Sequence, residues 1–305
     1  DGKHRAHWEK LTDLARPAIR FHLLPIPSTS ENNSLYVKMN SRGKPLTEFE
    51  NFKAELEDLM RANPAISQDA VRAFSQSIDT TWADLFWQYR GDNDLIDEEC
   101  MRYLRFLTEV LAWKHGIRVD HASPHDAREL VRLAKALFSA QSPRADQAGE
   151  TLCWMTHALD VWLEKGADGP RKPLAIDALF SLLFTREAHD APQPLRVFNF
   201  GEFGTAPVGV NLFHACCRLY GTGSWKLPHT VLLYGVLQGL MTGTPLPELP
   251  PRLRLLRNLI EASRSEVRAD ATRNNMPALL HEVDAIMAGE PLSAIHTFNQ
   301  VPVRN

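Results

Sequence analysis

The sequence is poor in the residues that build disulfide or zinc frameworks. Its four cysteines are Cys100, Cys153, Cys216 and Cys217, and no two of them form a Cys-x-x-Cys pair. Cys216 and Cys217 are neighbours in an apolar run of helical character, so we expect both to be buried thiols. Cysteines placed in this way are typical of a reducing compartment. They predict a cytoplasmic protein without a disulfide framework.

Long apolar runs and an excess of one charge are also missing. The most apolar stretch, residues 231–241, is shorter than the about 20 residues that cross a bilayer, and it includes Tyr234 and Gln238. It therefore predicts a core helix, and we expect no membrane partner. The 305 residues carry a formal net charge of -3. This charge argues against DNA binding by the whole surface but allows a local basic groove.

The common catalytic and metal-binding motifs are absent too. The sequence has no Walker-type glycine-rich loop, no Gly-x-Gly-x-x-Gly and no Gly-x-Ser-x-Gly. His121 and His125 flank Pro124, and no further residue at a recognised spacing completes a metal site, so we interpret this stretch as a loop before a helix. Catalytic residues are therefore unknown from the sequence, and no metal ligands are predicted.

The apolar residues predict a mainly α fold. A 3.6-residue period, which marks one face of a helix, recurs after Thr47. We predict helices at 7–14, 47–62, 67–90, 95–115, 124–139, 147–165, 174–187, 210–220, 230–241, 251–269 and 277–287. Alternating apolar residues predict strands at 18–24 and 35–40. The expected architecture is a multi-helix domain preceded by a short α/β remnant of one or two strands, divided into residues 1–46, 47–190 and 191–305.

Polar side chains crowd into the predicted turn between the second strand and the helix at 47–62. Gly43 can adopt a positive φ, and Thr47 is a good N-cap residue. Asn40, Arg42 and Lys44 therefore lie on a strand-to-helix elbow, where they could bind a phosphate. The alternative is a solvated turn, which is what most short polar turns are.

A second group of basic residues lies in the predicted helix at 251–269. Arg254, Arg257, Asn258, Arg264 and Arg268 recur at helical spacings opposite a row of leucines. A helix that faces phosphate or nucleic acid would have this pattern. The alternative is a solvated face on which the arginines are partly paired with neighbouring glutamates.

The elbow also carries a family resemblance. Asn40, Gly43, Leu46 and Thr47 match an Asn-x-x-Gly-x-x-Leu-[Ser/Thr] signature between a strand and a helix. In this respect the chain resembles a bacterial family typified by the amino-terminal, ParB/sulfiredoxin-like part of the GmrSD modification-dependent restriction enzyme. Residues 254–263 resemble an Arg-Asn-Leu segment near the end of that family's helical portion. The likeness is specific at 18–60 and looser at 250–268.

The resemblance implies a role in defence against foreign DNA. It implies GTP or ATP with Mg²⁺ as cofactor, DNA that is modified or unmodified as partner, and a second copy or another defence subunit as further partner. In this interpretation Asn40, Arg42 and Lys44 contact the nucleotide or phosphate. The DNA path is lined by Arg254, Arg257, Asn258 and Arg268.

The chain departs from the family pattern at its catalytic motifs. The family's Asp-Gly-Gln-Gln-Arg is missing, and residues 1–5 imitate it only by coincidence. No nuclease motif is present either. We therefore expect a fragment of an NTPase or endonuclease, with the catalytic motifs outside residues 1–305. The alternative from another class is a non-catalytic helical module that binds a partner protein.

Overall fold

A computed structural model describes residues 2–13, 15–16, 46–91, 94–120, 127–164, 171–186, 193–194, 211–270, 273–291, 293 and 295–298. The chain divides into two units, residues 1–46 and 47–305. The first contains helix α1 (Gly2–Thr12). This helix begins earlier than the predicted one at 7–14. Arg5 and Glu9, one turn apart on α1, form an ion pair at 3.1 Å. The predicted strands at 18–24 and 35–40 lie outside the described residues.

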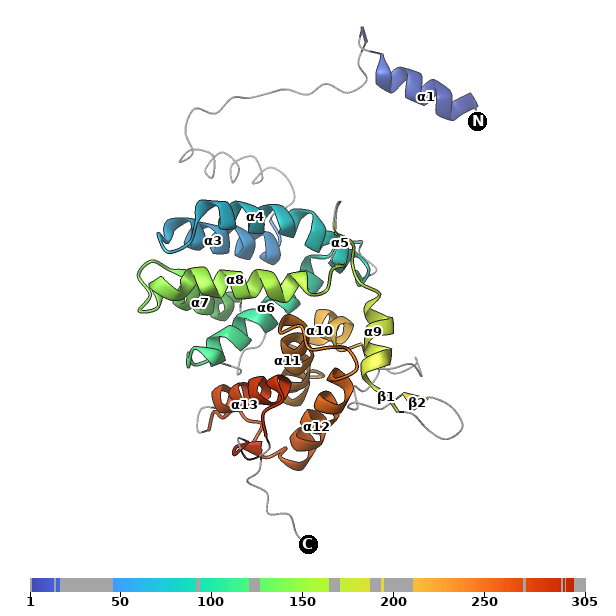
Figure 1. Ribbon diagram of the computed structural model, residues 1–305. Helices are drawn as coiled ribbons and strands as arrows, with labels where there is room; N and C mark the ends of the chain where they lie inside the picture. The colour runs from blue at the N-terminus through green and yellow to red at the C-terminus, as the bar shows by residue number, and fades with distance from the viewer. Residues whose placement is uncertain are drawn as a thin grey trace. The chain divides into compact units, whose positions relative to one another are not determined.

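The second unit is built from helices (Figure 1). They are α3 (Glu48–Ala62), α4 (Gln68–Asp79), α5 (Thr81–Trp87), α6 (Asp97–Lys114), α7 (Ala127–Phe138), α8 (Ala148–Asp160), α9 (Ile176–Leu183), α10 (Leu212–Leu219), α11 (Leu227–Met241), α12 (Leu249–Ala262) and α13 (Met276–Ala288). A 3-10 turn, η1 (Ala145–Gln147), precedes α8. The two-residue strands β1 (Thr185–Arg186) and β2 (Gln193–Pro194) pair antiparallel. The prediction of a mainly α, multi-helix protein is confirmed.

Helix α3 begins as the sequence predicts. The Thr47 side chain accepts a hydrogen bond from the Glu50 N–H at 3.2 Å, and the Thr47 N–H donates to the Glu50 carboxylate at 2.8 Å. This reciprocal capping box satisfies backbone donors that a helix start would otherwise leave unpaired. Phe52 and Leu56 then face the core. The helix that follows the elbow is therefore firmly placed, whereas Asn40, Arg42 and Lys44 themselves lie outside the described residues.

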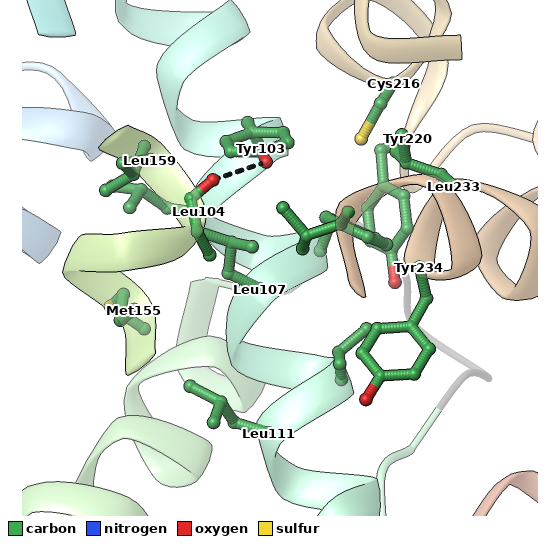
Figure 2. Packing of buried hydrophobic residues seen from close by; sticks show 14 of the residues in the cluster. Tyr103, Leu104, Leu107, Leu111, Met155, Leu159, Cys216, Tyr220, Leu233 and Tyr234 are labelled. Carbon is green, nitrogen blue, oxygen red and sulfur yellow. Dashed lines mark hydrogen bonds between the residues drawn. The ribbon is translucent and has the colours of Figure 1, made fainter. Parts of the chain in front are cut away.

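Helix α6 is the centre of the second unit. It contacts α3, α7 and α8 on one side and α10 and α13 on the other. Figure 2 shows Tyr103, Leu104 and Leu107 of α6 packed between side chains of α8 and those of α10 and α11. The Tyr103 hydroxyl donates to the Ala158 carbonyl at 3.1 Å and accepts from Trp162 Nε1 at 2.6 Å. The Tyr103 hydroxyl and Trp162 Nε1 are thus paired within this apolar core, as burial requires.

Three predicted helices end earlier than expected. The helix predicted at 67–90 is split, because Thr80 leaves helical geometry (φ -128, ψ -92) and its hydroxyl donates to the Gln76 carbonyl at 2.7 Å. The helix predicted at 147–165 stops at Asp160, and Leu163 then bridges Pro173. The helix predicted at 174–187 stops at Leu183, because the chain turns into β1.

Helix α12 also ends early, at Ala262 instead of 269. Ser263 is fully buried, and its hydroxyl donates to the Phe298 carbonyl. The chain then turns, with the Glu266 N–H bonded to the Ser263 carbonyl at 2.8 Å, and Ala269 bridges Asn274 in extended form. Arg264 and Arg268 are therefore not on the helix that carries Arg254, and the prediction of one arginine-bearing helix from 251 to 269 is wrong.

The segment at 295–298 is attached to α13 by one buried carboxylate. Glu282 accepts backbone N–H groups from His296 at 2.8 Å and Phe298 at 3.1 Å, and a further one from Thr297. Ile295 and Phe298 are buried beside it. Because hydrogen bonds to a charged acceptor are stronger than neutral ones, this contact fixes the segment against α12 and α13.

Candidate functional site

A cavity of about 570 Å³ opens where three segments of the second unit meet. One consists of Glu109 in α6 and of Arg118, Val119 and Asp120 after that helix. The second is the connection from Tyr220 to Leu227 between α10 and α11, and the third is the segment from Val267 to Asp270 after α12. The volume lies within the range of small-molecule sites, about 300–1,000 Å³. Because these segments are far apart in the sequence, the cavity exists only in the folded unit.

A glycine-containing turn forms one wall. Gly221 has φ +79, a left-handed conformation that glycine adopts without strain. The Thr222 N–H and hydroxyl both donate to the Leu219 carbonyl, at 2.9 and 2.7 Å, which closes the end of α10. A methyl group built on Gly223 would meet nothing within 4 Å. This wall is thus a fixed turn with open space at Gly223.

Aromatic rings support the turn from inside. Trp225 packs against Tyr220 at 5.6 Å and against His229 at 5.2 Å between ring centroids, and its Nε1 donates to the Thr230 hydroxyl at 2.9 Å. The Lys226 N–H donates to His229 Nδ1 at 2.9 Å, at the start of α11. Burial, together with nearby Lys226, lowers the pKa of His229 from 6.5 to about 4. His229 is therefore neutral near pH 7 and can keep accepting this bond.

Glu109 of α6 is the buried carboxylate of the cavity. Its side chain is only 4% exposed, it accepts the Tyr220 hydroxyl at 2.7 Å, and it lies 3.8 Å from Arg105 Nη1. Burial raises its pKa from 4.5 to about 7, against the lowering effects of the Tyr220 bond and of Arg105. A titratable group shifted toward neutral pH inside a cavity marks a candidate site.

Three exposed cations line the same cavity as Glu109. Arg118, Lys226 and Arg268 come from three different segments, and none is seen in an ion pair with a carboxylate among the described residues. Asp120 and Asp270 also line the cavity. The cavity therefore combines an exposed set of positive charges with two aspartates and an inner carboxylate. Its arrangement suits a ligand that carries negative charge at one end.

The structure separates the residues predicted to contact DNA. Arg254, Arg257 and Asn258 lie on one side of α12, since helical residues three and four apart share a side. Arg254 and Asn258 are exposed and Arg257 is half-buried. None of the three lines the cavity, whereas Arg268 does. Arg264, which the sequence placed on the same side, instead pairs with Glu261 at 2.6 Å.

Several residues of the cavity were missed by sequence reasoning. Glu109 sits in an apolar stretch of α6 and looks like an ordinary core-helix residue, and Arg118 follows that helix with no motif around it. The visible signal was Gly221-Thr222-Gly223, two glycines one residue apart that precede Lys226 and a helix. A turn of this kind lets backbone and ligand approach closely.

Among the described residues, no group of three or more histidine, cysteine, aspartate or glutamate side chains could hold a metal ion. None of the described helices is long and apolar enough to cross a membrane.

Comparisons with protein-family models, with curated proteins and with solved structures found no match to this chain.

Proposed function

We propose that this chain is part of a nucleotide-dependent, DNA-targeting defence protein and that its cavity binds a phosphate group. The observation that carries this proposal is the meeting of Arg118, Lys226 and Arg268 around one cavity, without a carboxylate partner for any of them among the described residues. Asp120 and Asp270 line the same cavity, so its exposed side chains carry a net charge of +1, and this remaining positive charge favours a bound anion. The match of Asn40, Gly43, Leu46 and Thr47 to the restriction-enzyme family supplies the biological setting.

Phosphate fits this set of groups chemically. Arginine forms paired hydrogen bonds with phosphate oxygens, and lysine supplies a mobile point charge. The residues at the start of α11, Lys226 and Leu227, also line the cavity. The Lys226 N–H is bonded to His229 Nδ1 and Pro228 has no N–H, so what favours an anion at this helix start is the positive end of the helix dipole. In this proposal GTP or ATP binds with Mg²⁺, and the metal is held chiefly by phosphates and water.

DNA is proposed to contact the side of α12 that carries Arg254, Arg257 and Asn258. Such contacts with the phosphate backbone position a protein on DNA without reading the sequence. Arg268 belongs to the cavity, so we assign it to the nucleotide phosphate instead of the DNA path. The nucleotide role of Asn40, Arg42 and Lys44 stays a prediction, as does assembly with a second copy or with another defence subunit.

The test is calorimetric titration of the whole chain with ATP and GTP, each with Mg²⁺, and with duplex DNA with and without base modification. Arg268→Ala is expected to weaken nucleotide binding by about 10- to 100-fold, because a lost hydrogen bond to a charged group costs about 1.5–3 kcal/mol. Arg254→Ala is expected to weaken DNA binding and to leave nucleotide binding unchanged. Arg72→Ala, an exposed arginine paired with Asp69 on α4, is the control for both.

The proposal is wrong if the wild-type chain binds neither nucleotide, or if Arg268→Ala and Arg72→Ala bind it equally well. Such a result would favour the alternative, a non-catalytic helical module that binds a partner protein. Binding of nucleotide but not of DNA would retain the cavity and remove the DNA role of α12.

A further inference from the structure

The buried carboxylate of Glu109 lies in the same cavity as the three cations, and this pairing restricts how an anion can bind. The cations are exposed, whereas the Glu109 side chain is 4% exposed. A phosphate held by the cations would bring further negative charge into a cavity that already contains the carboxyl groups of Glu109, Asp120 and Asp270. Like charges at close quarters favour the neutral form of an acid.

We propose that the cavity takes a phosphate ester with an uncharged polar body, such as a nucleotide, and binds it with Glu109 in the neutral carboxylic acid form. This inference rests on the proposed function. In such a complex the phosphate contacts the exposed cations and the rest of the molecule occupies the cavity toward Glu109. A neutral carboxyl can donate as well as accept a hydrogen bond, so it suits an uncharged polar group.

Groups on every neighbouring element bear on the Glu109 proton. Arg105 on α6 and the Tyr220 hydroxyl after α10 favour the charged form, whereas Glu129 on α7 opposes it. Cys216 on α10 is a buried thiol whose pKa is raised well above its usual value by burial, so it stays neutral. The remaining charges of the cavity belong to Arg118, Asp120, Lys226, Arg268 and Asp270. His229 is neutral above about pH 4 and does not titrate in the range that matters.

The expected consequence is that binding weakens as the pH rises. With a pKa of about 7, Glu109 is about ten times more often protonated at pH 6 than at pH 8. If only the protonated state binds, the apparent affinity falls by about the same factor of ten. Glu109→Gln keeps the shape and neutrality of the protonated side chain, so this variant should not lose affinity for that reason.

The experiment measures the dissociation constant of ATP and of GTP for wild type and for Glu109→Gln at pH 6 and pH 8. For each nucleotide, the dissociation constant of wild type is divided by that of Glu109→Gln. Protonation of the nucleotide itself affects both proteins and cancels in this ratio. We expect a ratio near one at pH 6 and about ten, in favour of the variant, at pH 8. Glu98→Gln, an exposed glutamate on the same helix, should give a ratio near one at both pH values.

A second variant covers the case in which Glu109→Gln does not fold. Tyr220→Phe removes a hydrogen bond that favours the charged form of Glu109, so the loss of affinity should move to higher pH than in wild type. An unchanged ratio for Glu109→Gln together with an unchanged profile for Tyr220→Phe would overturn the inference while leaving phosphate binding in place. Absence of nucleotide binding to wild type at both pH values would instead refute the proposed function.

Discussion

The buried Glu109 predicts how the stability of the unliganded protein changes with pH. Folding raises the pKa of this carboxyl from 4.5 to about 7, so the folded state holds the proton more tightly than the unfolded state. The stabilisation is therefore fully present below about pH 4.5 and is lost as the pH rises through about 7. At about 1.4 kcal/mol for each pKa unit, the loss amounts to about 3 kcal/mol.

Glu109→Gln removes this dependence, because an amide does not titrate. The free energy of unfolding of wild type minus that of the variant should fall by about 3 kcal/mol between pH 4.5 and pH 8. Other groups act in the opposite direction in both proteins. His229 has its pKa lowered to about 4, so its contribution is present above about pH 6.5 and is lost as the pH falls. Subtracting the variant from wild type cancels such groups.

The assay is urea unfolding followed by circular dichroism at closely spaced pH values. Glu98→Gln is the matched control, since its carboxylate is 66% exposed and paired with Arg102 at 2.7 Å. The free energy of unfolding of Glu98→Gln should differ from that of wild type by a nearly constant amount between pH 4.5 and pH 8. The claim that burial holds this carboxyl neutral would be refuted if the free energy of unfolding of wild type minus that of Glu109→Gln stayed constant or grew with pH.

Three further substitutions test packing in the second unit. In thermal unfolding, Gly149→Ala should destabilise by about 1–3 kcal/mol, because its Cβ would lie 2.7 Å from the Ala65 carbonyl oxygen, although alanine is the better helix former. In the same assay Gly223→Ala should be near neutral, because its Cβ would meet nothing within 4 Å. Glu282→Gln should lower the free energy of unfolding by about 1.5–3 kcal/mol. It should also speed hydrogen exchange of the N–H groups of residues 296–298, because the Glu282 carboxylate accepts their hydrogen bonds. Unchanged exchange would contradict that role.

The parts of the fold that could be predicted depend on local signals. The capping box at Thr47 and Glu50 is four residues long, and the apolar rows of α3 and α13 repeat within each helix. Cys216 and Cys217, predicted to be buried, are fully buried in α10. Such features need only neighbouring residues, and the structure reproduces them within a few residues.

The end of α12 could not be predicted in this way. The local sequence after Ala262 continues with arginine, serine and valine, which a helix accepts. What stops the helix is Ser263, which is fully buried and bonded to the Phe298 carbonyl 35 residues later. A tertiary contact of this kind leaves no local pattern, so the sequence placed Arg268 on a helix that ends before it. The proposed ligand of Arg268 is still a phosphate, now that of the nucleotide instead of the DNA backbone.

The placement of Glu109 shows why the cavity is the best candidate for function. A carboxylate at this position costs stability at neutral pH, since a neutral residue of the same shape would avoid the burial of charge. The carboxyl has two partners in the fold, the Tyr220 hydroxyl at 2.7 Å and Arg105 at 3.8 Å, whereas its α6 neighbours Thr108 and Val110 are uncharged and buried. Strongly shifted pKa values cluster at functional sites as well as in structural ion pairs. The change in the stability difference between Glu109→Gln and wild type from pH 4.5 to pH 8 therefore measures the cost of charging this carboxyl inside the cavity.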